Sequence, residues 1–99
     1  MQKFSLLAPT RERSYSVERL LQSLITTTKT LSEIEILFAI DNDDIQTKNY
    51  FDTIFKERKF STINIKTHYR ERSIMLNRDY YNFLAEKAEG EFLWIIGDD

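Results

Sequence analysis

The sequence predicts an α/β fold in which a mostly parallel four-stranded sheet lies between two layers of helices. Four apolar runs of strand length alternate with three segments whose apolar residues recur at helical spacing. The segments between successive strands are long enough for the crossover that a parallel pair requires. The chain has 99 residues, which is enough for one domain with one core. We therefore expect a single domain over residues 1–99.

In the first half of the chain, strand and helix signals alternate twice. The first strand is expected over residues 4–8, and Pro9 ends it because proline has no N–H for the ladder. The second strand covers residues 34–40, and a second helix covers about residues 47–57. The helix between the two strands is marked by apolar residues at i, i+3, i+4, i+7 and i+8: Val17, Leu20, Leu21, Leu24 and Ile25.

The second half repeats the pattern. Alternation through Ile63 and Ile65 predicts a shorter third strand over residues 60–66. A fourth, buried strand is expected over residues 91–96, with Trp94 in the core. Right-handed crossovers then favour the strand order 3-2-1-4, with a switch point between strands one and four. The third helix is marked by five apolar residues before a terminating Gly90: Leu76, Tyr80, Phe83, Leu84 and Ala88.

Composition excludes several classes of function. The formal net charge is -2, so neither nucleic acid nor an anionic membrane is an expected partner. The chain has no cysteine, which excludes disulfides, thiolate metal sites and cysteine nucleophiles. It shows neither a signal peptide nor an apolar run of membrane-spanning length. We expect a folded domain without an integral membrane segment, with a cytoplasmic location.

Two adjacent carboxylates, Asp98 and Asp99, follow the last predicted strand. Carboxylate oxygens at the carboxyl end of a buried strand suit Mg²⁺ or Mn²⁺ held against a phosphorylated ligand. The competing interpretation is a pair that caps a turn or helix, because aspartate is common in turns.

A second acidic cluster, Asp41, Asn42, Asp43 and Asp44, follows the second strand. Its oxygens can accept hydrogen bonds from the imide N–H of a base or from ribose hydroxyls. The alternative is an N-terminal cap for the helix that begins near Ile45. Both can hold, with Asp43 or Asp44 as the cap and Asp41 or Asn42 turned to a ligand.

Basic residues occupy two places near the predicted site. Thr10, Arg11 and Arg13 leave the first strand, where an arginine can meet a phosphate or the edge of a base, although solvated loop arginines are commoner. His68 has no nucleophile partner suggested by spacing, and we expect it on the surface. The remaining basic concentration either neutralises a diphosphate or forms a solvated face: Lys66, His68, Arg70, Arg72 and Arg78.

Three segments in chain order resemble the N-terminal, nucleotide-sugar-binding part of family 2 glycosyltransferases, which have the GT-A fold. Residues 4–11 (FSLLAPTR) resemble the opening strand and its Pro-Thr loop. Residues 36–44 (ILFAIDNDD) are similar to the strand that ends in the uracil-contacting aspartate. Residues 82–99 resemble the asparagine-containing helix, the A-x-G-E-[FY] turn and the D-x-D strand. Neither a G-x-G-x-x-G nor a P-loop motif is present.

The resemblance implies a Rossmann-like half of a GT-A fold that binds a nucleotide-diphospho-sugar, with a UDP-sugar as the first choice. Pro9, Thr10 and the adjacent Arg11 would line the nucleotide pocket. Asp98 and Asp99 would hold the Mn²⁺ or Mg²⁺ that bridges the diphosphate, with Asp98 also facing the nucleotide. The base or ribose would be read by one residue of the second acidic cluster: Asp41, Asn42 or Asp43.

The motifs depart from the family pattern at two places. The familiar Asp-Asp-Gly-Ser is replaced by Asp41-Asn42-Asp43-Asp44, which leaves the register of the base-reading carboxylate open. If Asp98 is the first member of D-x-D, its last member would follow Asp99. We therefore expect a domain truncated at this motif, without the acceptor site and catalytic base of the C-terminal half, and inactive alone.

Two other classes of function compete with the donor-binding part of a metal-dependent glycosyltransferase. One is a small flavodoxin-like module that binds a cation or nucleotide without catalysis. The other is a fragment whose exposed sheet edge pairs with another chain, which would produce a homo-oligomer.

Overall fold

The computed structural model describes residues 3–72 and 76–96, with side chains in the second range from residue 79 onward. Its elements follow the order β1 (Phe4–Thr10), α1 (Ser14–Thr27), a 3₁₀ turn (Leu31–Glu33), β2 (Ile34–Asp41), α2 (Ile45–Lys56), β3 (Asn64–Arg70), α3 (Leu76–Lys87) and β4 (Phe92–Ile95). All strand pairs are parallel and the sheet order is β3-β2-β1-β4. The predicted fold class and the strand order 3-2-1-4 are confirmed.

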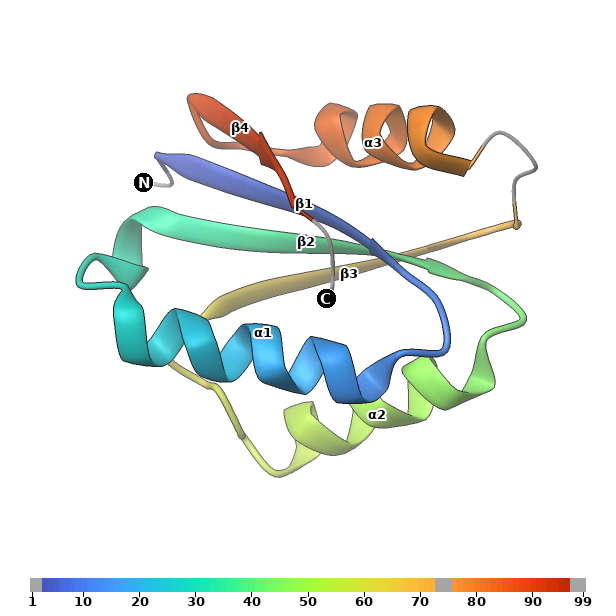
Figure 1. Cartoon of the computed structure of the whole chain (residues 1–99), viewed down its shortest axis with the longest axis horizontal. Helices are drawn as coiled ribbons and strands as arrows, with labels where there is room; N and C mark the ends of the chain where they lie inside the picture. The colour runs from blue at the N-terminus through green and yellow to red at the C-terminus, as the bar shows by residue number, and fades with distance from the viewer. Residues whose placement is uncertain (1–2, 73–75, 97–99) are drawn as a thin grey trace.

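The helices form two layers, with α1 and α2 on one face of the sheet and α3 on the other (Figure 1). Strand residues alternate between these layers because successive side chains point to opposite faces. Leu6 and Phe38 pack with Phe51 of α2 in the larger cluster, whereas Leu7 packs with Leu84 of α3 in the smaller one. Within the described residues, no helix is long and apolar enough to cross a membrane.

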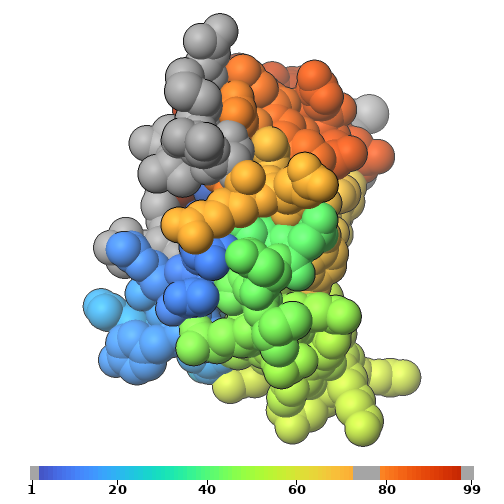
Figure 2. Space-filling model, turned by 90° about the vertical axis from the view of Figure 1, so that its right-hand side faces the viewer, coloured from blue at the N-terminus to red at the C-terminus, as the bar shows by residue number. Residues whose placement is uncertain are grey.

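Because the strands are parallel, the loops that leave their carboxyl ends gather at one edge of the sheet. Thr10 pairs with Ile40, and Asp41 pairs with Arg70. Figure 2 shows this edge face on, where the residues after β1 (blue) and those after β2 (green) lie against each other. We call it the carboxyl edge.

The first strand continues beyond its predicted end and includes both Pro9 and Thr10. The carbonyl of Leu7 accepts from Ile96 N of the segment after β4. Backbone groups two residues apart point to the same side of a strand, so the missing N–H of Pro9 also faces the β4 side. The described pairing with β4 ends at Leu7, so Pro9 interrupts no described ladder.

The predicted bounds of the third strand were wrong. Residues 60–66 were expected, but β3 runs from Asn64 to Arg70. Arg58 and Phe60 have φ of 56° and 61°, and Ile63 N donates to Phe60 O, so this segment turns before the strand begins. Phe60 and Ile63 are nevertheless buried, which is why their spacing imitated a strand.

The expectation of a buried final strand with Trp94 in the core was also wrong. All four residues of β4 are exposed, and Trp94 is 57% exposed. The strand lies at the end of the sheet, while α3 packs chiefly on β1 and β2 and the other two helices cover the opposite face of those strands. An apolar run therefore forms an edge strand here.

Candidate nucleotide site at the carboxyl edge

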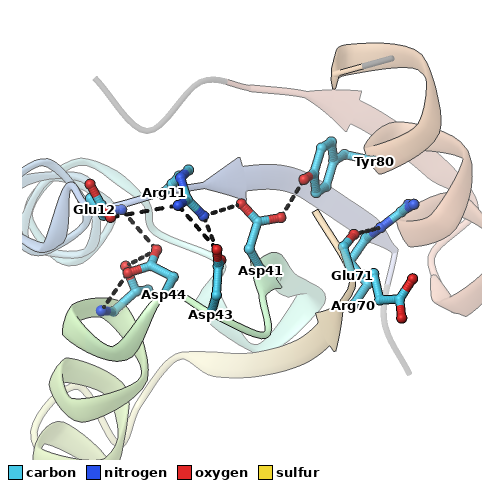
Figure 3. A network of polar contacts seen from close by, with 9 residues as sticks. Arg11, Glu12, Asp41, Asp43, Asp44, Arg70, Glu71 and Tyr80 are labelled. Carbon is cyan, nitrogen blue, oxygen red and sulfur yellow. Dashed lines mark hydrogen bonds and ion pairs between the residues drawn. The ribbon is translucent and has the colours of Figure 1, made fainter. Parts of the chain in front are cut away.

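A polar network joins the loop after β1, the loop after β2 and helix α3 at the carboxyl edge (Figure 3). Arg11 lies at its centre. Its Nη1 donates to Asp41 Oδ2 and Asp43 Oδ1, both at 2.8 Å, and its Nη2 donates to Asp43 Oδ2 at 3.4 Å. The guanidinium fork matches the geometry of a carboxylate, so one side chain holds two acidic residues of the neighbouring loop.

Asp41 is buried within the network, with 3% of its surface exposed. One of its oxygens accepts from Arg11 and the other accepts from the hydroxyl of Tyr80 on α3. Tyr80 is buried as well, and the guanidinium of Arg70 lies over its ring with 4.7 Å to the centroid. Asp41 therefore ties the two central strands to α3.

Asp44 forms the N-terminal cap of α2, which is one of the two caps that the sequence predicts, Asp43 or Asp44. Its Oδ1 accepts from Thr47 N at 3.1 Å and its Oδ2 accepts from the Thr47 hydroxyl at 2.7 Å. The same Oδ2 accepts from Glu12 N at 2.8 Å, which fastens the loop after β1 to α2. Glu12 has φ of 50°, so this bond holds the loop in a left-handed backbone conformation.

Asn42 and Asp43 are the exposed acceptors of the segment Asp41–Asp44. Asn42 uses its backbone N–H on Arg70 O, and its side chain is exposed. Asp43 has 63% of its side chain exposed, and the adjacent Arg11 guanidinium holds the pKa of its carboxyl below the usual range. Asp43 is thus a charged acceptor at neutral pH that faces both solvent and Arg11.

The other residues predicted to line the nucleotide pocket lie beside these acceptors. Thr10 is buried at the end of β1, and Pro9 before it is partly exposed. Arg11 has 29% of its side chain exposed. The structure therefore brings together the residues predicted from the first and second segments: Pro9, Thr10, Arg11, Asp41, Asn42 and Asp43.

The predicted basic concentration does not form one solvated face: Lys66, His68 and Arg70 are partly buried and Arg72 is exposed, while the side chain of Arg78 lies outside the described residues. Lys66 and Arg70 belong to β3, where Lys66 pairs with Glu35 at 2.6 Å and Arg70 lies over the rings of Tyr80 and Phe83. His68 was expected on the surface but is partly buried beside Phe83 of α3. Burial lowers the pKa of His68, and the neighbouring charges of Lys87 and Lys66 lower it further. These groups serve the packing of α3.

A second network ties the turn before β4 to the sheet, and no motif or spacing in the sequence predicts it. Glu35 is buried in β2, where its Oε2 accepts from the Ser5 hydroxyl and from Glu89 N, each at 2.6 Å. Gly90 N donates to Ser5 Oγ at 2.8 Å. Burial raises the pKa of Glu35, but Lys66 and these donors outweigh it and lower the pKa overall. The buried carboxylate is therefore charged and well partnered.

Asp98 and Asp99, the predicted metal ligands, lie outside the described residues. In the part of the chain that the structure describes, no group of three or more acidic or histidine side chains is placed to hold a cation. The acidic residues of the carboxyl edge are bonded instead to Arg11, Tyr80 and Thr47.

A hollow of about 540 Å³ lies away from this edge, between the end of α2 and the start of β3. It is lined by Leu31, Ser32, Ile54, Phe55 and residues 58–65. None of the lining residues is acidic, and none of them belongs to the polar network at the carboxyl edge. We find no basis for a catalytic site in this hollow.

Comparison with solved structures identifies the architecture. Residues 1–349 of S. aureus TarS in complex with UDP align with a TM-score of 0.80 and 24% identity, over 99% of this chain and 28% of TarS 1–349. The complex with UDP-GlcNAc aligns with a TM-score of 0.78 and 26% identity, over 99% of this chain and 27% of the other. The chain has the fold of the N-terminal part of GT-A glycosyltransferases.

A second glycosyltransferase shows the same GT-A-like architecture at lower identity. The mannosyltransferase PcManGT from Pyrobaculum calidifontis, in complex with GDP-Man and Mn²⁺, aligns with a TM-score of 0.81 and 14% identity. The alignment covers 98% of this chain and 27% of that enzyme. No family model and no curated protein sequence matches the chain. The resemblance read from the three motifs is thus confirmed by structure, and the chain spans less than a third of each of these neighbours.

Proposed function

We propose that this chain is the donor-binding part of a glycosyltransferase that moves a sugar from a nucleotide-diphospho-sugar to an acceptor. The observation that carries the proposal is the meeting of the Pro9–Arg11 and Asp41–Asp44 segments at the carboxyl edge of this fold. Ligands of open α/β sheets bind outside the carboxyl ends of the strands. The structural neighbours that share the fold hold UDP, UDP-GlcNAc or GDP-Man.

Within this site, the residues divide into supports and ligand-facing groups. Asp41 and Asp44 are buried and fully engaged with protein donors, so they shape the loop. Asn42 and Asp43 are exposed, and we assign to them the contacts with the base or ribose. Their oxygens can accept the imide N–H of uracil, so a UDP-sugar is the donor to test first.

The divalent cation is assigned to Asp98 and Asp99. Their carboxylates are hard oxygen donors of the kind that Mn²⁺ and Mg²⁺ prefer. The sequence places Asp98 two residues after Ile96, whose N–H donates to Leu7 O just before the Pro9–Arg11 segment. A cation bound there would offset the negative charge that develops on the departing nucleoside diphosphate.

The complete reaction needs groups beyond the donor-binding and cation-binding residues assigned above. Sugar transfer requires an acceptor site, and in inverting enzymes a base that takes the acceptor proton. None of the residues assigned above has that role. We expect the purified chain to bind the donor nucleotide weakly and to transfer no sugar.

Titration calorimetry with UDP, with and without Mn²⁺, tests the proposal. We expect UDP binding that depends on Mn²⁺ in the wild type and is lost in Asp99→Ala. Asp52→Ala is a matched control, because Asp52 is an exposed aspartate on α2 away from the edge. GDP serves as the comparison base. Mn²⁺ binding that is indifferent to nucleotide would instead support a cation-binding module.

A further inference from the structure

We propose that Arg11 is an internal competitor of the nucleotide for Asp43. The inference rests on the proposed function, since it concerns the base and ribose side of the same site. Arg11 presents only donors, and it already directs two of them to the two oxygens of Asp43, at 2.8 and 3.4 Å. A base N–H or a ribose hydroxyl that uses Asp43 must take these positions from Arg11.

The Arg11–Asp43 contact is the one in the network that a ligand can replace at least cost. The bonds of Asp41 to Tyr80 and of Asp44 to Thr47 are buried. In contrast, Asp43 is 63% exposed and Arg11 is 29% exposed. Exposed ion pairs stabilise a protein little because water screens both charges. Displacement of Arg11 from Asp43 therefore leaves the buried part of the network intact.

Arg11 remains at the edge after displacement, because its Nη1 also donates to the buried Asp41 at 2.8 Å. After Asp43 is displaced, Nη2 keeps only the longer, exposed contact with Glu12 Oε1 at 3.6 Å. It can then turn to an anion, because guanidinium groups bind phosphate oxygens well. The two halves of a nucleotide thus meet opposite effects. Arg11 opposes binding of the nucleoside and favours binding of the diphosphate.

This opposition gives Arg11→Gln a distinctive signature. Removal of the competitor should tighten uridine binding by about two- to fivefold, the range expected for an exposed ion pair. The affinity for UDP with Mn²⁺ should rise less than the affinity for uridine, or should fall, because the variant also loses the positive charge of Arg11 near the diphosphate. The matched control is Arg19→Gln, which makes the same charge change on α1, where Arg19 lies over the ring of Tyr15 at 5.8 Å.

The experiment is a titration of uridine and of UDP with Mn²⁺, followed by NMR, on the wild type, Arg11→Gln and Arg19→Gln. Circular dichroism checks that each variant folds. If Arg11→Gln does not fold, the ¹⁵N guanidinium signal of Arg11 in the wild type replaces it. That signal should shift on uridine addition, because Arg11 leaves Asp43.

Each outcome decides the matter. Tighter uridine binding in Arg11→Gln with unchanged binding in Arg19→Gln supports the competitor role. Uridine binding that is equal or weaker in Arg11→Gln, or an Arg11 signal that ignores uridine, overturns it while leaving the proposed function in place. An absence of binding by uridine and by UDP with Mn²⁺ in every variant overturns both.

Discussion

Strands β2 and β4 are both apolar runs, yet they have opposite environments. All eight residues of β2 (Ile34–Asp41) are buried, including Glu35 and Asp41. All four residues of β4 (Phe92–Ile95) are exposed, including Trp94. The charged residues are thus inside and the tryptophan is outside, so position in the sheet outweighs side-chain polarity.

The difference follows from what covers each strand. The central strand β2 has a strand on either side and helices on both faces, so even its polar residues must find partners within the protein. The edge strand β4 pairs only with β1 among the described strands. The buried carboxylates therefore lie in the covered centre of the described sheet, and the apolar strand β4 lies at its end.

The largest expected effect is the loss of a core ring in β2. Phe38 is fully buried, with its ring 4.9 Å from that of Phe51, so Phe38→Ala should lower the free energy of unfolding by about 3–5 kcal/mol. Trp94→Ala removes a larger ring from β4, but its exposure limits the loss to at most about 1.5 kcal/mol. Urea unfolding measures both. Equal losses would contradict the contrast between the strands.

The buried carboxylate of β2 gives the next largest effect. Glu35→Gln replaces a charged acceptor of Ser5, Glu89 N and Lys66 with a neutral amide, and we expect a loss of about 1–3 kcal/mol at pH 7. Ser5→Ala removes one donor to Glu35 and the acceptor of Gly90 N, but it leaves the charge of Glu35 paired with Lys66, so it should cost less than Glu35→Gln. Chemical denaturation at pH 7 compares the two, and a larger loss in Ser5→Ala would contradict this order.

The same carboxylate makes the stability depend on pH. In the folded protein the pKa of Glu35 lies below its ordinary value of 4.5. Its contribution is therefore fully present above pH 4.5 and is lost as the pH falls through the lower folded value. The stability difference between the wild type and Glu35→Gln should shrink on acidification below pH 4.5. A difference that grows there would mean that Glu35 is neutral in the folded protein.

The attachment of β4 to the sheet depends on Gly90, whose place after the third helix predicts only a helix terminator. Helix α3 ends at Lys87, and a Cβ on Gly90 would lie 2.5 Å from Ser5 Oγ and 2.9 Å from Phe4 C. Gly90→Ala should therefore cost about 1–3 kcal/mol, measured by urea unfolding. In a Ser5→Ala background the cost should fall but not vanish, because the backbone contact remains. Full rescue would contradict that contact.

The smallest effect on stability is expected at the exposed end of the network. Asp43→Asn removes the charge that faces Arg11 but leaves Asp41 bonded to both Arg11 and Tyr80. The melting temperature should stay close to that of the wild type, while affinity for UDP with Mn²⁺ should fall. Thermal melts and calorimetry measure the two properties on one sample. A large drop in melting temperature would show that Asp43 is structural.

Much of the candidate site could be predicted because it lies in loops that directly follow strands. Pro9–Arg11 and Asp41–Asp44 each leave a parallel strand, and parallel strands bring their carboxyl ends together. The partners of these residues could not be predicted in the same way. Tyr80 and Arg70 reach the network from α3 and β3, and their helical and strand spacing identified them only as core or basic residues.

The errors at β3 and β4 are of two kinds, because apolar spacing shows neither which element carries a buried residue nor whether a strand is covered. Phe60 and Ile63 are buried from a turn, and Phe92 and Trp94 are exposed on a strand. By itself, the sequence determined the element order, the parallel sheet, the strand order and the loops that form the site, because these depend on periodicity and connection length. Only the tertiary structure decided which carboxylates are buried and which of them Arg11 holds, because those depend on contacts between segments 30 or more residues apart.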